Sequence, residues 1–360
     1  MINRKTLFSL LMMLCIFGAA FVPFEDAYAV AAGEKQSSFE YKQYRDQNQY
    51  RNALDQKMPR VCSAIGGAID DKGTIPIPGL ISTCTKTEGN ISESPDFVPQ
   101  GVCLADRYIL VTSYHAKKQK RSVIYVVDKA NKTLVSTLTV PNKYHMGGIA
   151  FDGSNIWLTG DTSDKYEGEP FVQYIRYEDF SRMINEPVYE ISKDEISAPV
   201  YIKNKPSFLE CDNGILWVGT YMGRGSSKKG IINGYKINKK ENGPELNTFM
   251  YSVITGIDSS AQGADIKGDY LYVSSSYAGA IGSVRSSFIT KYNIKEIENG
   301  GSDINVSGKE LKRVEVPKMN EEIIVADGRI LINFEAAADC WISTVIATDR
   351  LLSVRDSIWR

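Results

Sequence analysis

The sequence predicts an all-β fold, a β-propeller of five blades that is closed by an N-terminal strand. The first observation is a pattern that occurs five times after residue 97, in which an Asp or Gly turn precedes a short apolar run. The centres of the five runs lie 47 to 60 residues apart. A period of about 40 to 50 residues is typical of propeller blades, and the longer intervals predict inserted loops. The centres are Leu110, Trp157, Trp217, Tyr272 and Leu331.

A second apolar run follows each of the first ones. The residues that end these second runs lie 49 to 58 residues apart, which is close to the spacing of the first runs. Each unit is therefore expected to contain at least two strands in a fixed order. The runs 156–158 and 216–218 are apolar at consecutive positions. Such strands need cover on both faces, and blades that pack face to face provide it.

Further apolar stretches predict the outer strands of the first four blades, at 133–140, 188–191, 246–253 and 311–316. The fifth unit has no such stretch before the sequence reaches Arg360. Because an unpaired edge promotes aggregation, we expect an earlier segment to close the ring. The candidate is 75–82, whose prolines are compatible only with a sheet edge.

The N-terminal region predicts export. Arg4 and Lys5 precede the apolar stretch 7–22, and small residues at 27 and 29 suit a signal peptidase. We expect a signal peptide at 1–29, because 16 apolar residues are fewer than the roughly 20 of a membrane-spanning helix. The expected parts that follow are a polar extension or amphipathic helix at 30–60, a ring-closing segment at 61–96 and the propeller at 97–360.

Five cysteines follow the predicted signal peptide. Disulfides are possible in an exported chain, but the odd number leaves at least one thiol unpaired. Cys103 and Cys211 lie on predicted innermost strands, where they are expected to be buried. The remaining three, Cys62, Cys84 and Cys340, are the candidate disulfide partners, and their pairing stays open.

Charge and composition exclude several classes of partner and cofactor. The net charge of −1 gives no electrostatic reason to expect nucleic acid or an anionic membrane as a partner. With two histidines and no Cys-x-x-C motif, no zinc site is expected. Carboxylates at the channel mouth are suitable calcium ligands, but the sequence has no EF-hand loop. The cofactor is therefore unknown and no metal site is assigned.

The repeat also predicts a ligand site. In a propeller, the loop before the innermost strand and the loop after the second strand lie on the same rim. Residues four positions after each centre and ten positions before it are mostly hydrogen-bonding, which favours a ligand site at one mouth of the channel. These residues are Tyr114, Asp161, Tyr221, Ser276 and Glu335 in the first register, and Gln100, Gly147, Ser207, Gln262 and Glu321 in the second.

The expected function is binding of an extracellular carbohydrate or peptide, because aromatic rings and amides suit neutral polar ligands. His145 is a further candidate, since the glycines 147–148 would let a ligand approach the backbone. His115, beside the lysine-rich stretch 117–121, is a weaker one. The candidate ligand-binding residues are Gln100, Tyr114, His145, Tyr221 and Gln262.

Two alternative functions, an enzyme and a protein-binding scaffold, stay open. Glycosidases place two carboxylates at the site, which makes Asp161 and Glu335 candidate catalytic residues of a hydrolase or lyase. The second alternative is a scaffold that binds proteins along its outer blade edges. The glycine-rich stretch 223–230 lacks the spacing of a phosphate-binding loop and lies between strands, which favours a solvated hairpin loop. Further carboxylate candidates are Asp265, Glu321 and Glu210.

The segment 98–152 resembles a group of secreted β-propeller proteins of Gram-positive bacteria. The resemblance is carried by Pro-Gln-Gly at 99–101, Ser-Tyr at 113–114, the strand 122–129 and His-Met-Gly-Gly-Ile-Ala at 145–150. It implies export and the propeller fold. No activity is established for that group, so the resemblance assigns no catalytic residue.

Overall fold

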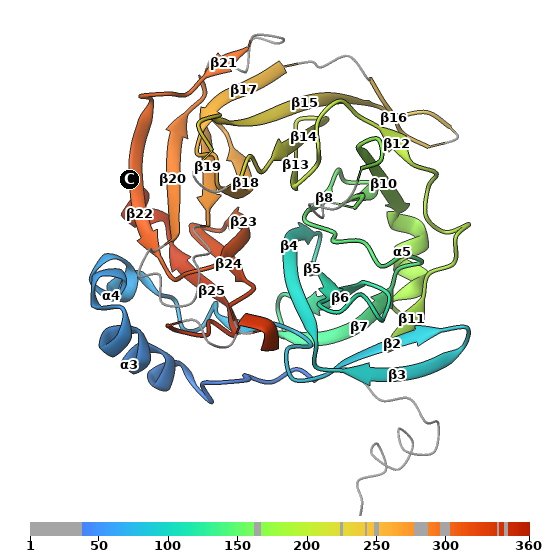
Figure 1. Cartoon of the computed structure of the whole chain (residues 1–360), viewed down its shortest axis with the longest axis horizontal. Coiled ribbons are helices and arrows are strands. Elements are labelled where there is room, and N and C mark those ends of the chain that lie inside the picture. The colour runs from blue at the N-terminus through green and yellow to red at the C-terminus, as the bar shows by residue number, and fades with distance from the viewer. Residues whose placement is uncertain are drawn as a thin grey trace, which may run out of the picture. The chain divides into compact units, whose positions relative to one another are not determined.

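The computed structural model describes residues 38–161, 167–223, 226–241, 243–247, 252–276, 287–295, 303–336, 338–341 and 345–360. Within these residues, five sheets of four to six strands lie around one axis, as Figure 1 shows. Each sheet is one blade, with its first strand next to the axis. The prediction of a five-bladed propeller is confirmed.

The blades follow one another along the chain. The first contains β4 (Phe97–Ala105), β5 (Tyr108–His115), β6 (Val123–Asp128) and β7 (Thr133–Thr139). The second contains β8 (Ile149–Phe151), β9 (Asn155–Thr159), β10 (Phe171–Arg176) and β12 (Val200–Tyr201). The third contains β13 (Phe208–Asp212), β14 (Ile215–Thr220), β15 (Gly230–Asn238), β16 (Glu245–Leu246), β17 (Ser252–Ile257) and β21 (Ile304–Asn305). The fourth contains β18 (Ala261–Lys267), β19 (Tyr270–Ser275), β20 (Ser287–Asn293) and β22 (Glu310–Val316). The fifth contains β23 (Asn320–Ala326), β24 (Arg329–Phe334), β25 (Arg350–Arg355) and β1 (Ile75–Pro76).

Local sequence explains the repeated turn between the first two strands of a blade. In the third blade the two-residue loop is Asn213–Gly214, with φ of 50° and 73°. In the fifth it is Asp327–Gly328, with φ of 53° and 71°. Positive φ at both positions is the type I′ geometry, whose twist matches that of the flanking strands. The Asn-Gly and Asp-Gly turns therefore fix the first strand pairs of the third and fifth blades.

One predicted outer strand belongs to a different blade. The stretch 188–191 was expected to complete the second blade, but β11 (Val188–Glu190) pairs in parallel with β7 of the first. The helix α5 (Tyr177–Met183) follows β10 and leads the chain to that neighbour. β12 pairs with β10 and is the outer strand of the second blade. The stretches 133–140 and 311–316 do form outer strands, β7 and β22. Of the predicted stretch 246–253, residues 248–251 lie outside the described residues. β16 and β17 both pair with β15, and β21 is the edge strand of the third blade.

The N-terminal strand closes the ring. Ile75 and Pro76 of β1 lie opposite Leu351 and Arg350 of β25, in antiparallel register. The buried Ile77 extends this pairing by donating its N–H to the carbonyl of Asp349 at 3.0 Å. Pro76 has no N–H to donate, which is compatible with its place on the edge strand. The prediction of closure by the segment before the first blade is confirmed.

The segment before β1 contains two helices, α3 (Gln47–Lys57) and α4 (Pro59–Ile65), and a 3₁₀ turn, Gly66–Ala68. Asp46 caps α3, since its Oδ1 accepts a hydrogen bond from the N–H of Gln49 at 2.9 Å. Figure 1 shows both helices beside the fourth and fifth blades. A separate hairpin, β2 (Thr83–Thr87) and β3 (Asn90–Ser94), follows β1. Two further 3₁₀ turns are Asp339–Trp341 and Asp356–Trp359.

A buried ion pair joins this segment to the fifth blade. The guanidinium of Arg350 is 2.7 Å from the carboxylate of Asp349, and both side chains are fully buried. Arg350 also donates to the carbonyl of Tyr44 at 2.8 Å. Asp349 in turn accepts from the backbone N–H of Gln43 at 2.6 Å and of Tyr44 at 3.1 Å. Rings of Tyr41, Tyr44 and Tyr50 lie around the guanidinium.

The cysteines form no disulfide within the described part of the chain. Cys62 lies on α4, Cys84 is buried on β2, and Cys340 is exposed in the 3₁₀ turn after β24. No bridge therefore joins these three candidates. Cys103 is buried on β4 as expected, and Cys211 on β13 is half-buried. Among the described residues, no helix has the length and apolar character that a bilayer crossing requires.

We predict that Arg350→Ala lowers the free energy of unfolding by about 3–5 kcal/mol, because it leaves the Asp349 carboxylate buried without its partner. Urea denaturation of the chain from residue 30 onward measures this. The control is Arg182→Ala, which removes an arginine of α5 whose side chain is 69% exposed. Equal losses in the two variants would show that the buried pair does not hold the N-terminal segment in place.

Candidate functional site

The centre of the ring is held by one carboxylate. Glu322, at the start of β23, is 1% exposed. Its Oε2 accepts hydrogen bonds from the N–H of Val102 at 3.1 Å and of Ile149 at 3.3 Å. Its Oε1 accepts from the N–H of Leu209 at 3.0 Å. A side chain of the fifth blade thus binds the innermost strands of the first, second and third blades.

Glycines allow the innermost strands to approach this carboxylate. A Cβ on Gly101 would lie 2.9 Å from the Glu322 Oε2, and one on Gly263 would lie 2.5 Å from the Glu322 Cα. A Cβ on Gly148 would lie 2.5 Å from the backbone nitrogen of Leu209. The backbone at Gly148 therefore packs against the third blade. The prediction that Gly148 lets a ligand approach the backbone is wrong. Gly147 lines the cavity described next.

A cavity of about 680 Å³ opens at the rim where the innermost strands begin. All five candidate ligand-binding residues line it, together with Glu321 and Glu335 of the fifth blade. The structure thus brings together residues as far apart in the chain as Gln100 and Trp341. The lining residues are Gln100, Tyr114, Ala116, Lys117, Lys118, His145, Gly147, Lys205, Ser207, Tyr221, Gln262, Glu321, Glu335 and Trp341.

Irregular pairing positions several of these side chains. The register between innermost and second strand shifts between Pro99 and Val102 in the first blade, and between Asn320 and Ile323 in the fifth. A similar shift in the fourth blade surrounds Gln262. β-Bulges redirect side chains and are common beside functional sites. Gln100, Gln262 and the pair Glu321–Glu322 all lie on these bulges.

Two carboxyl groups from the fifth blade lie in the buried part of the cavity. Glu335 Oε2 accepts from Gln100 Nε2 at 3.1 Å, and Glu321 Oε1 from Gln262 Nε2 at 3.5 Å. Burial raises the pKa of Glu335 to about 7, although hydrogen bonds from Gln100 and Trp341 favour its charged form. Burial and the nearby charges of Glu335 and Glu322 hold the pKa of Glu321 well above its usual range. A proton is therefore available within this pair near neutral pH.

Aromatic and basic side chains form the rest of the cavity wall. The rings of Tyr114 and His145 are in contact, with their centroids 4.2 Å apart. Burial, and then the charge of Glu335, raise the pKa of Tyr114 above its usual value, so its hydroxyl stays protonated. Trp341 keeps 37% of its surface exposed and can cover a ligand. The exposed Lys117 and Lys118 lie at the cavity's outer edge.

Some sequence-predicted residues lie elsewhere. Asp161, beyond the end of β9, and Ser276, beyond the end of β19, are not among the residues that line the cavity. Asp265 accepts from the N–H of Val325 at 2.6 Å and joins the fourth blade to the fifth. Glu210, on β13, does not line the cavity either. His115 is buried, with Nε2 3.2 Å from the hydroxyl of Ser94, and holds a loop.

The sequence analysis missed five lining residues, which are Ala116, Lys117, Lys118, Lys205 and Trp341. Trp341 lies in a 3₁₀ turn beyond β24, outside both registers used for the prediction. A tryptophan in the loop after a second strand is a signal that could have been used, since such loops reach the rim. Lys117, Lys118 and Lys205 also lie in loops beside the predicted positions.

Within the described residues, no group of three or more His, Cys, Asp or Glu side chains is placed to hold a metal ion. The calcium ion considered from the sequence therefore has no site there. The carboxyl groups at the cavity instead accept hydrogen bonds from amide side chains of neighbouring blades.

No family model and no curated protein matches the sequence. Among solved structures, this chain is similar to hydrazine synthase of Kuenenia stuttgartiensis, with 10% identity and a TM-score of 0.36, over 69% of its length. This chain spans 57% of that one. It is also similar to a computationally designed protein, Ika4, with 8% identity and a TM-score of 0.29, over 55% of this chain and 91% of the designed one.

We predict that the wild type loses stability relative to Glu335→Gln as the pH rises from 5 to 8. A pKa raised to about 7 in the folded state means that the neutral form stabilises the fold. That contribution is present in full below about 4.3, the unfolded value, and is lost as the pH rises through 7. The expected difference is on the order of 2 kcal/mol, measured by urea denaturation at both pH values. Glu178→Gln, an exposed carboxyl, serves as control, and parallel pH profiles for wild type and Glu335→Gln would contradict the assignment.

Proposed function

We propose that this chain is an exported β-propeller that binds an extracellular carbohydrate or peptide in the rim cavity. The observation that carries the proposal is the convergence of polar and aromatic side chains from all five blades on one cavity of about 680 Å³. This volume falls within the roughly 300–1,000 Å³ that small-molecule sites occupy.

The lining supports a neutral, hydroxyl-rich ligand, which makes carbohydrate the first choice and peptide the second. The amides of Gln100 and Gln262 donate and accept hydrogen bonds, and a protonated carboxyl does both as well. The rings of Tyr114, Tyr221 and Trp341 present apolar faces with polar edges, which suit the faces of a sugar ring. A buried carboxyl pair disfavours an anionic ligand at the same point.

Export is part of the proposal and rests on the sequence. The predicted signal peptide, 1–29, lies outside the described residues, and its basic start, apolar stretch and small residues support secretion. The resemblance to secreted propellers of Gram-positive bacteria supports the same location. We therefore expect an extracellular small molecule, glycan or peptide as the partner, and neither nucleic acid nor a stable membrane anchor.

One observation favours a second candidate, a glycoside hydrolase or lyase. Glu321 and Glu335 line the same cavity, and burial raises the pKa of both. A carboxyl that keeps its proton near neutral pH can act as a general acid, while its partner acts as base or nucleophile. Glu321 takes the place that the sequence analysis gave to Asp161, which does not line the cavity.

We predict saturable binding of at least one ligand from a panel of oligosaccharides and peptides, measured by isothermal titration calorimetry on the chain from residue 30. Tyr114→Ala and Trp341→Ala are each expected to weaken binding by roughly 3- to 10-fold, the value of one aromatic contact. Tyr201→Ala removes an exposed tyrosine from the outer strand β12 and is expected to leave binding unchanged.

The same panel separates the candidate functions when products are analysed by chromatography. Saturable binding without product supports the binding protein. Product that is lost in both Glu321→Gln and Glu335→Gln supports the enzyme. If Tyr201→Ala weakens binding while Tyr114→Ala and Trp341→Ala do not, the ligand binds at the outer blade edges, as in an interaction scaffold.

A further inference from the structure

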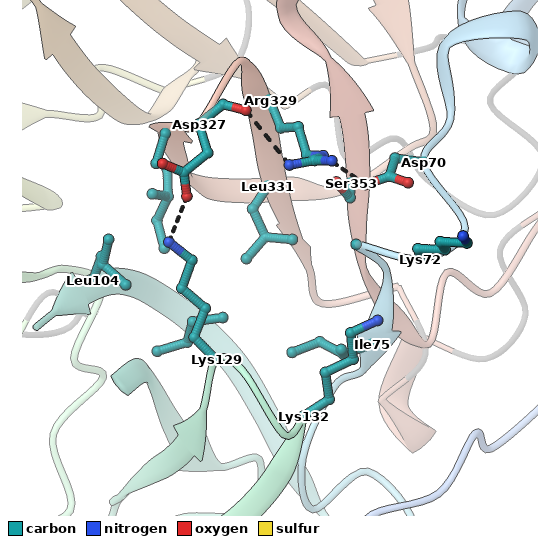
Figure 2. Close-up of a pocket in the computed structure, with 14 residues that line it drawn as sticks. Asp70, Lys72, Ile75, Leu104, Lys129, Lys132, Asp327, Arg329, Leu331 and Ser353 are labelled. Carbon is teal, nitrogen blue, oxygen red and sulfur yellow. Dashed lines mark hydrogen bonds and ion pairs between the residues drawn. The ribbon is translucent and has the colours of Figure 1, made fainter. Parts of the chain in front are cut away.

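A second pocket lies at the seam between the first and fifth blades. It is lined by the ends of β4 and β23, whose starting residues line the rim cavity. The two sites are therefore on opposite faces of the propeller. The pocket has a volume of about 230 Å³, and the closing strand β1 contributes Ile75 to its wall. Figure 2 shows the side chains around it.

The floor of this pocket is aliphatic. Ile109 of the first blade and Ile324 of the fifth contribute to it, and both are less than a tenth exposed. No aromatic side chain is among the described lining residues. Branched aliphatic surface of this kind suits a flexible alkyl chain, which gains contact area without requiring a flat partner. The other aliphatic lining residues are Ile75, Leu104, Ala326 and Leu331.

The mouth of the pocket carries net positive charge. Lys129 pairs with Asp327 at 2.6 Å, and Arg329 pairs with Asp70 at 2.6 Å, as the dashed lines in Figure 2 show. These four charges cancel in pairs. Lys72 and Lys132 also line the pocket, and neither has an ion-pair partner in the part of the chain that the structure describes. The residues that line the pocket therefore carry two uncompensated positive charges.

We propose that this pocket binds an aliphatic carboxylate of medium chain length. The alkyl chain lies on the aliphatic floor and the carboxylate faces the ammonium groups of Lys72 and Lys132. The volume limits the length, because about 230 Å³ is below the roughly 300 Å³ at which sites for drug-sized ligands begin. This site is independent of the rim cavity and of its proposed function.

The place of the pocket gives binding a structural consequence. Ile75 of β1 and Ser353 of β25 belong to the strand pair that closes the ring, and both line the pocket. A ligand that contacts β1 and both blades binds the closed ring and not the unfolded chain. Binding therefore raises the melting temperature, and the rise increases with ligand concentration.

The test uses octanoate as the probe, measured by isothermal titration calorimetry on the chain from residue 30, with melting temperature as a second readout. We expect one saturable site, affinity that falls with added salt, and no comparable binding of acetate, which lacks the chain, or of octylammonium, which has the opposite charge. The double variant Lys72→Gln/Lys132→Gln should weaken octanoate binding by roughly 2- to 5-fold for each lysine.

The matched control is Lys57→Gln/Lys193→Gln, which removes two lysines that do not line the pocket. It is expected to bind octanoate like the wild type. Binding of 1-octanol should be equal in wild type and in the Lys72/Lys132 variant, because only the chain contributes. Absence of saturable octanoate binding, equal octanoate affinity in the two double variants, or equally tight binding of acetate would each overturn the proposal.

Discussion

The geometry of the ring depends on the Glu322 carboxylate, which accepts backbone hydrogen bonds from the first three blades while belonging to the fifth. A buried carboxyl group needs hydrogen bonds in place of its hydration, and three N–H donors supply them here, although burial still holds the pKa of Glu322 well above its usual range. The donors can reach it because Gly101 leaves room, since a Cβ there would lie 2.9 Å from both the Glu322 Oε2 and the nitrogen of Ile149. Four of the five innermost strands are thus tied to one side chain, and Asp265 of the remaining blade binds the N–H of Val325 on β23.

The candidate ligand site depends on the β-bulge of β23, the strand that also contains Glu322. The register shift between Asn320 and Ile323 allows the neighbouring residues Glu321 and Glu322 to serve different purposes, one lining the rim cavity and the other holding the axis. A residue of the candidate ligand site and the residue that joins the blades at the axis are therefore neighbours in the sequence. At the outside of the ring, the buried Arg350–Asp349 pair joins the N-terminal segment to the fifth blade, whose edge strand is β1.

Local signals predicted most of this fold, because the blade strands and the type I′ turns of the third and fifth blades depend on neighbouring residues. The rim residues also followed from the repeat, since blade topology alone places strand starts together. Features that depend on distant partners could not be predicted in this way. The pairing of β11 with β7, the function of Gly148 in packing against Leu209, and the convergence of three blades on Glu322 all require the assembled ring. Trp341 was missed because loop positions outside the strands have no repeat register.

The most direct test of the central claim is amide hydrogen exchange, measured residue by residue by NMR in the wild type and in Glu322→Ala. The account predicts that the amides of Val102, Ile149 and Leu209 lose protection together, although they lie in three different blades. It also predicts a loss of unfolding free energy of more than about 3 kcal/mol, because each unpaired buried donor costs about 1–3 kcal/mol. Glu321→Ala is the neighbouring control and should leave these three amides protected. Unchanged protection of the three amides in Glu322→Ala would contradict the account.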